Sequence, residues 1–207
     1  MYRRVKRFID VVVSLLALAL AAFPMAIIAT AIRVTMGSPV IYRSTRPGMH
    51  GIPFVILKFR TMRHHTYSSS RNGLSEEERL TPLGRWLRSF SLDELPELIN
   101  VLNGEMSLVG PRPLLTRYLD RYTEEQARRH LVKPGITGWA QINGRNAPTW
   151  EEKLQLDRWY VDNQTVLLDL RILLRTLPQV VRRAGISAEG HATMPEFWGS
   201  DGENLEP

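Results

Sequence analysis

The strongest constraint on the fold of this chain is an uncharged, apolar run near its amino terminus. The run extends from Val11 to Ile32 and is interrupted only by Ser14, Pro24 and Thr30. As a helix it would be about 33 Å long, just enough to cross the hydrocarbon part of a bilayer once. The sequence therefore predicts an amino-terminal segment that interacts with a membrane.

Three interpretations of this run are open: a cleaved signal peptide, a single membrane span, and a hairpin that enters and leaves by the same face. The run is long for a signal peptide, whose apolar part has about 7–15 residues. Pro24 favours the hairpin, because a proline inside a helix removes a hydrogen bond and kinks it. We therefore expect residues 1–35 to form a re-entrant membrane anchor, kinked at Pro24, and residues 36–207 to form a cytoplasmic domain.

The distribution of charge supports this orientation. Residues 1–63 hold ten Lys or Arg and one acid, whereas the whole chain has a net charge of +6. Basic residues on both flanks of the apolar run should keep both ends cytoplasmic. Clustering around the run points to membrane lipid or phosphate as partners and not to nucleic acid. The chain has no cysteine, which excludes thiol catalysis, disulfides and cysteine-based zinc sites.

Two adjacent carboxylates, Asp93 and Glu94, mark one short stretch. Ser91 and Glu94 have the spacing of a capping box, and Pro96 is tolerated only near the first turn of a helix. Apolar residues then recur at helical spacing until Asn103-Gly104 ends the run. Both acids should therefore lie at the positive end of a helix, about 100° apart around its axis. Ordinary helix-start acids are the alternative.

Short strands and amphipathic helices are expected after the anchor. Residues 40–42 and 54–57 predict two strands separated by a Gly/Pro turn. Residues 81–90 predict a basic amphipathic helix suited to a membrane surface or to burial against the body. Residues 150–163 and 166–184 predict two more helices. The expected fold class is α/β and mostly helical, with a small catalytic body, short β-strands, interfacial helices and the re-entrant anchor.

Turns rich in glycine and proline carry several cations. Arg112 stands between Pro111 and Pro113, which fix the backbone on both sides. Such a preorganised guanidinium could bind phosphate through two hydrogen bonds or pair with a helix-start acid. Segments 133–138 and 143–146 predict two more turns with donors and cations. No Walker or dinucleotide fingerprint is present.

Acids at a helix start beside cationic loops suit phosphoryl transfer. A carboxylate can hold Mg²⁺, which prefers oxygen ligands, or it can attack phosphorus to form an aspartyl phosphate. The cations would neutralise charge on the transferred group. Asp157 is a candidate third carboxylate, with a surface ion pair as its alternative role.

Five motifs, in order, resemble the bacterial sugar transferase family, the monotopic phosphoglycosyl transferases. They cover nearly the whole chain, whose size resembles the minimal, PglC-like form. A further likeness lies in the tail, residues 190–197. The five motifs are Lys6-Arg7-Phe8-Ile9-Asp10, Lys58-Phe59-Arg60-Thr61-Met62, Ser91-Leu92-Asp93-Glu94-Leu95-Pro96, Gly110-Pro111-Arg112-Pro113 and Lys133-Pro134-Gly135-Ile136-Thr137-Gly138.

The resemblance implies transfer of a sugar 1-phosphate from a UDP-sugar to undecaprenyl phosphate, with release of UMP, on the cytoplasmic face of the bacterial inner membrane. It implies that Asp93 is the nucleophile, forms a covalent phosphosugar intermediate and contacts Mg²⁺, while Glu94 assists as base or positioner. It also implies phosphate binding by four basic residues, Arg112, Lys58, Arg88 and Arg145.

The PglC likeness further implies an N-acetylated donor such as UDP-N,N′-diacetylbacillosamine. A UDP-hexose-specific member of the family and a non-catalytic scaffold that binds anionic lipid are the alternatives. Many relatives have a small polar residue before the membrane proline, but this chain has Phe23, which leaves the sharpness of the bend open. Formation of a homo-oligomer is also left open.

Overall fold

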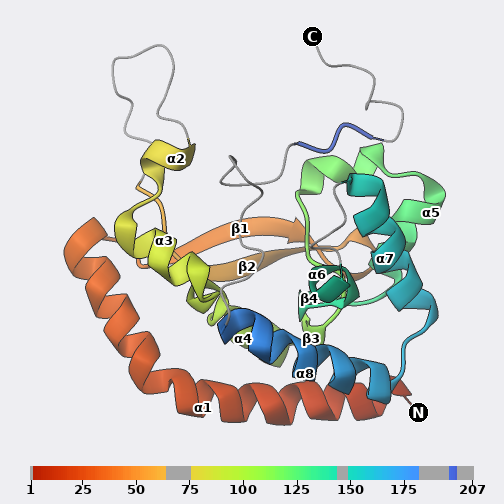
Figure 1. Ribbon diagram of the computed structural model, residues 1–207, viewed down its shortest axis with the longest axis horizontal. Coiled ribbons are helices and arrows are strands. Elements are labelled where there is room, and N and C mark those ends of the chain that lie inside the picture. The colour runs from red at the N-terminus through yellow and green to blue at the C-terminus, as the bar shows by residue number, and fades with distance from the viewer. Residues whose placement is uncertain (1, 64–75, 144–148, 182–195, 200–207) are drawn as a thin grey trace.

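The computed structural model describes residues 2–63, 76–143, 149–181 and 196–199 (Figure 1). Arg145 and tail residues 190–195 lie outside the described residues. Within the described parts the chain is mostly helical with short strands, as the sequence predicts.

The first two strands form a hairpin that carries Lys58, one of the basic residues singled out in the sequence. Strand β1 (Ile41–Pro47) pairs antiparallel with β2 (Pro53–Phe59), and both are longer than predicted because the pairing extends to the turn. A short 3-10 turn, η1 (Met49–Gly51), joins them. The hairpin therefore extends to Pro47 and brings its turn towards the proline-rich loops of the body.

A second pair of strands corrects the sequence interpretation. The sequence predicts only turns around Arg112 and over residues 133–138, but β3 (Ser107–Val109) and β4 (Gly135–Thr137) pair in parallel. The absence of a side chain at Gly135 permits this approach, because a Cβ there would lie 2.1 Å from the backbone nitrogen of Gly110. Local sequence does not reveal such pairing, since it depends on a distant segment.

The remaining elements are helices of varied length. Helix α3 begins as expected at Thr81, whose hydroxyl accepts a hydrogen bond from the Gly84 amide. The helices after α1 (Tyr2–Met36) are α2 (Glu76–Arg79), α3 (Pro82–Ser89), α4 (Glu97–Asn103), α5 (Glu124–Ala127), α6 (Trp139–Asn143), α7 (Trp150–Asp162) and α8 (Val166–Val181). Three further 3-10 helices are η2 (Leu92–Glu94), η3 (Thr116–Arg121) and η4 (Arg128–Leu131).

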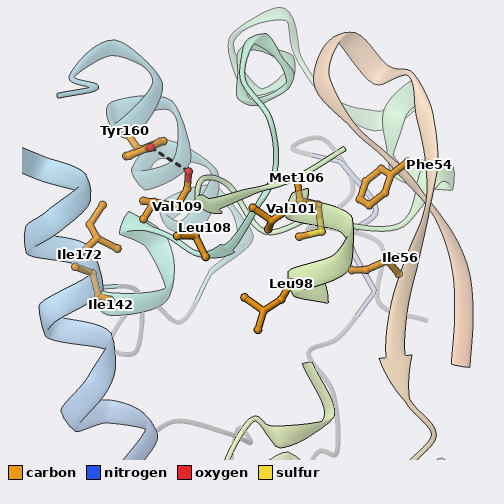
Figure 2. Packing of buried hydrophobic residues seen from close by; sticks show 10 residues of the cluster. All are labelled: Phe54, Ile56, Leu98, Val101, Met106, Leu108, Val109, Ile142, Tyr160 and Ile172. Carbon is orange, nitrogen blue, oxygen red and sulfur yellow. Dashed lines mark hydrogen bonds between the residues drawn. The ribbon is translucent and has the colours of Figure 1, made fainter. Parts of the chain in front are cut away.

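One hydrophobic core joins β2, α4, β3 and helices α6 to α8 (Figure 2). Tyr160 lies at its edge, and its hydroxyl donates to Asp169 (2.7 Å), while the hydroxyl oxygen also lies 3.1 Å from the Val109 carbonyl oxygen. The buried members are Phe54, Ile56, Leu98, Val101, Met106, Leu108, Val109, Ile142, Tyr160 and Ile172. The core fixes α4 against β2 and so places the acidic stretch beside the hairpin.

Asn100 strengthens the contact between α4 and β2. Its side-chain oxygen accepts a hydrogen bond from the Leu57 amide (3.0 Å), and its side-chain nitrogen donates to the Val55 carbonyl (2.7 Å). Asn100 is almost completely buried, and these bonds satisfy backbone groups on the strand edge that β1 does not cover.

The amino-terminal segment is one helix, α1 (Tyr2–Met36), which is long and apolar enough to cross a membrane. Figure 1 shows that α1 changes direction partway along its length. Pro24, the one proline in the helix, accounts for the bend because it has no backbone N–H to donate. The segments before and after Pro24 are therefore parts of one continuous, bent helix.

Both halves of α1 pack against the body. In the first half, buried Asp10 accepts hydrogen bonds from the Ser107 hydroxyl and the Leu108 amide, each 3.1 Å long. In the second half, Ile32 is fully buried in a cluster that includes Leu87 of α3. The helix thus lies along the body, and its opposite face exposes apolar side chains, among them Phe8, Leu16, Leu20, Phe23, Ile27 and Val34.

Candidate active site

The acidic pair lies in a turn that differs from the predicted helix start. Ser91 adopts a left-handed conformation (φ 55°), and Asp93 and Glu94 lie in the 3-10 turn η2. Helix α4 begins at Glu97, just after Pro96, and ends at Asn103 before Gly104, as predicted. The predicted capping box is wrong, because the Ser91 side chain makes no capping hydrogen bond and Glu94 binds Lys58 and Arg112 instead.

Glu94 is held between two cations from distant segments. Lys58 of β2 donates a hydrogen bond from Nζ to Glu94 Oε1 (2.6 Å), and Arg112 donates from Nη2 to the same oxygen (2.5 Å). Charge-assisted hydrogen bonds of this kind are stronger than neutral ones, which is why Glu94 is drawn away from the helix terminus. The pairing of Arg112 with a helix-start acid, one of its two predicted roles, is therefore present.

The pKa values of the two adjacent acids move in opposite directions. Burial raises the pKa of Asp93, and the negative charge of Glu94 raises it further. Burial also opposes ionisation of Glu94, but Arg112 and Lys58 outweigh it and hold the pKa of that carboxyl well below its usual range. Glu94 is thus the fixed negative charge of the pair, and Asp93 is the more basic carboxylate.

Asp93 is buried but chemically available. Only 8% of the residue is exposed, and its carboxylate makes no hydrogen bond or ion pair with any residue that the structure describes. Lys58, Arg88 and Arg112 are close enough to oppose the rise in its pKa. A carboxylate with free lone pairs beside several cations can act as a nucleophile towards an anionic phosphoryl group or as a metal ligand.

Glu97 is a third site carboxylate that the sequence analysis did not identify. It is 2% exposed, and its Oε1 lies 3.0 Å from Lys58 Nζ, although without good hydrogen-bond geometry. Burial and the charge of Glu94 raise the pKa of Glu97 to about 7. The sequence contains one indication of this role. Glu97 is three residues after Glu94, at the start of α4, and this spacing places both acids on the same side of the turn.

A buried ion pair supports the backbone of the Arg112 loop. Arg129 donates through Nη2 both to Asp157 (2.7 Å) and to the backbone carbonyl of Arg112 (2.7 Å). The predicted surface ion pair for Asp157 is wrong in its location, since Asp157 and Arg129 are both almost completely buried. Asp157 therefore acts indirectly, because it holds Arg129 against the Arg112 loop, and it is not one of the carboxylates of the site.

The other predicted phosphate-binding residues have different outcomes. Arg88 donates from Nε to the Thr61 hydroxyl (3.1 Å) and is near Asp93, as its effect on the pKa of Asp93 indicates. Arg145 lies outside the described residues. In the tail, Phe197 is buried against Tyr118, and Arg121 of η3 binds Glu196, so this part of the tail packs on η3.

The donor set is compatible with a single magnesium ion bound mainly by substrate. No group of three His, Asp or Glu side chains with metal-ligand spacing occurs among the described residues. Mg²⁺, however, usually keeps several waters and binds proteins through one or two carboxylates together with substrate phosphate. The free carboxylate of Asp93 fits that chemistry, whereas Glu94 is already engaged by two cations.

Comparison with known proteins gives consistent matches. The family described as bacterial sugar transferase matches residues 1–183. The chain is 51% identical over 195 residues to the "Uncharacterized sugar transferase EpsL" of Bacillus subtilis, which covers 94% of this chain and 96% of that protein. The alignment thus extends over nearly all of both proteins.

Two further relatives carry the names of reactions. The chain is 39% identical to the "UDP-glucose:undecaprenyl-phosphate glucose-1-phosphate transferase" of Caulobacter vibrioides, over 85% of this chain and 69% of the relative. It is 37% identical to the "Undecaprenyl-phosphate galactose phosphotransferase" of Salmonella typhimurium, over 88% of this chain and 42% of the relative. The chain spans less than half of the Salmonella protein.

Proposed function

This chain belongs to the bacterial sugar transferase family and is therefore a transferase, and from that premise we propose that it moves a hexose 1-phosphate from a UDP-hexose to undecaprenyl phosphate and releases UMP. The observation that carries this proposal is the cluster of Asp93, Glu94, Lys58 and Arg112, in which a free carboxylate lies beside cations that can bind phosphate.

The proposed donor replaces the one expected from the sequence. An N-acetylated donor such as UDP-N,N′-diacetylbacillosamine was expected, but the Caulobacter and Salmonella relatives are named as a glucose and a galactose enzyme. These names favour a UDP-hexose, the first alternative in the sequence analysis.

We assign the nucleophile to Asp93. An oxygen of its carboxylate attacks the phosphorus attached to the sugar, a bond forms between them, and the bond to the bridging oxygen breaks, so that UMP leaves with that electron pair. A phosphate oxygen of undecaprenyl phosphate then attacks the same phosphorus and displaces Asp93, which gives undecaprenyl-diphosphate-hexose. The raised pKa of Asp93 makes its carboxylate a better nucleophile once ionised.

The neighbouring residues would bind and neutralise the negative charges of the substrate without forming covalent bonds to it. Arg112 is about half exposed and uses only Nη2 on Glu94, so its other N–H groups can bind a donor phosphate. Glu94 keeps Lys58 and Arg112 in place beside Asp93. Mg²⁺, held by Asp93 and the donor phosphates, would neutralise part of the diphosphate charge.

A lipid acceptor requires the site to lie at a membrane surface. Helix α8 runs beside the first half of α1 (Figure 1), and Lys6 of α1 pairs with Asp169 of α8 (2.7 Å). Both helices expose apolar side chains, those of α8 being Leu167, Leu170, Leu174 and Leu177. We propose that this surface lies in the cytoplasmic leaflet of the inner membrane and that α1 re-enters there without crossing.

The test is release of UMP by the purified full chain from UDP-glucose, UDP-galactose and UDP-N,N′-diacetylbacillosamine, with undecaprenyl phosphate and Mg²⁺. We expect turnover with a hexose donor. In the Asp93→Asn variant we expect loss of turnover and of a covalent phosphosugar adduct detectable by mass spectrometry. Full activity of Asp93→Asn would refute the nucleophile, and no UMP release from any donor would favour a non-catalytic lipid-binding scaffold.

A further inference from the structure

Arg46 of β1 is a partly buried cation that has no hydrogen-bond or ion-pair partner among the described residues. Its side chain forms no ion pair and no hydrogen bond with any other residue in the described ranges, and its Nε is shielded from solvent. Burying an arginine without a hydrogen-bond acceptor is unfavourable, so such a residue commonly serves a ligand. None of the roles given above uses Arg46.

The strand register places Arg46 on the same face as Lys58. Arg46 pairs with Phe54, and residues 54, 56 and 58 of β2 point to one face, the face on which Phe54 and Ile56 are buried. Lys58 and Phe54, which pairs with Arg46, are four residues apart on β2, or roughly 13 Å along the strand. The inner face of the hairpin thus has a cation near each end.

Arg112 is near both of these cations. It contacts Glu94 together with Lys58, and it lines the same small pocket as Pro47, the residue that follows Arg46. Burial lowers the pKa of Arg46, and the positive charge of Arg112 lowers it further, so the two guanidinium groups repel each other. Glu97 acts in the opposite direction, but its close contact is with Lys58.

Two neighbouring guanidinium groups, one of which has no acceptor among the described residues, can together bind a multiply charged anion. We propose that Arg46 is a second phosphate-binding arginine of the donor site and that, with Arg112, it binds the phosphate of the nucleotide that leaves as UMP. This inference rests on the proposed function. Arg46 is at the end of the hairpin away from Lys58 and Glu94, so it faces the part of the diphosphate farther from Asp93.

The assay compares Arg46→Gln with wild type and with Arg43→Gln. Arg43 is on the same strand but on its opposite, exposed face, which makes it a matched control. A hydrogen bond to a charged group contributes about 1.5–3 kcal/mol, or about 10- to 150-fold in affinity. We expect Arg46→Gln to raise the KM for UDP-hexose and the inhibition constant of UMP about tenfold or more, while the KM for undecaprenyl phosphate and both constants in Arg43→Gln stay unchanged.

A structural role would not produce this pattern. An unchanged UMP inhibition constant in Arg46→Gln, or an equal increase in Arg43→Gln, would overturn the assignment. If Arg46→Gln does not fold, Arg46→Lys decides: it keeps the charge but loses the forked donors, so UMP affinity should be intermediate, and wild-type affinity would count against the proposal.

Failure of the proposed function can be separated from failure of this inference. If the wild type releases no UMP from any hexose donor, calorimetric titration of the full chain with UMP still tests Arg46. Binding by wild type and Arg43→Gln but about tenfold weaker binding by Arg46→Gln would support the site. Equal binding by all three proteins, or no binding by the wild type, would overturn it.

Discussion

At the residue scale, Lys58 illustrates how one cation determines the state of two carboxylates. Its Nζ lies 2.6 Å from Glu94 and 3.0 Å from Glu97, but Arg112 assists only at Glu94. Glu94 therefore stays ionised, whereas burial and the charge of Glu94 raise the pKa of Glu97 to about 7. One lysine is insufficient to keep both buried acids charged.

This difference predicts a pH-dependent effect of Glu97→Gln on stability. The pKa of Glu97 rises from an ordinary 4.5 to about 7 on folding, so its contribution to stability is present below about pH 4.5 and is lost as the pH rises through 7. Gln resembles the protonated acid. Glu97→Gln should therefore have little effect at pH 5 and should stabilise the protein at pH 8, by about 1–3 kcal/mol.

Thermal unfolding in detergent at the two pH values measures this effect. Glu124→Gln, in an exposed position at the start of α5, serves as the control. It should shift the melting temperature equally at pH 5 and at pH 8. Equal shifts in melting temperature for Glu97→Gln at pH 5 and pH 8 would show that Glu97 does not take up a proton on folding.

At the scale of elements, η4 and α7 are joined by two ion pairs of contrasting burial. Arg129 and Asp157 are almost completely buried, whereas Arg128 and Asp162 are each about 40% exposed. Burying a pair is costly, and removing one partner leaves an uncompensated charge. The exposed pair is screened by solvent and contributes little.

We expect Asp157→Asn to destabilise the protein by about 3–5 kcal/mol, because Arg129 keeps its charge inside the body. Asp162→Asn should cost less than about 1 kcal/mol. Melting temperatures of the two variants measure the contrast. Since Arg129 also binds the Arg112 carbonyl, Asp157→Asn should raise the KM for the UDP-sugar as well. Similar stability losses in both variants would contradict this account of the buried pair.

At the scale of the whole molecule, α1 is attached to the body along both of its halves. Asp10 binds β3 near one end, and Ile32 packs with Leu87 of α3 near the other. A helix that crossed the bilayer would have to separate one of these halves from the body. The bend at Pro24 allows both contacts to form while the apolar outer face remains available to lipid.

Labelling of single cysteines tests this arrangement without interference, because the natural chain has none. Arg4→Cys and Arg43→Cys are at exposed positions before and after the apolar run. Both should react with a membrane-impermeant maleimide only after the cytoplasmic side is opened, as should Glu124→Cys on the body. Reaction of Arg43→Cys from the outside of intact cells would refute re-entry.

Sequence by itself determined the features that depend on local chemistry. The uncharged run from Val11 to Ile32 had to form an apolar helix, and Pro24 had to disturb it. Thr81-Pro82 set the start of α3, and Asn103-Gly104 the end of α4. The ordered motifs indicated the family, and they marked Asp93, Glu94 and Arg112 as candidates, because these residues lie within short and recognisable segments.

Only the tertiary structure decided which partners these residues have. Ser91 and Glu94 have capping-box spacing, yet Lys58 and Arg112, 36 and 18 residues away, compete successfully for the carboxylate. The pairing of β3 with β4, the burial of Asp157 and the inward face of Arg46 likewise depend on segments distant in sequence. Burial strengthens such long-range electrostatic contacts, and burial is a property of the assembled fold and not of any local pattern.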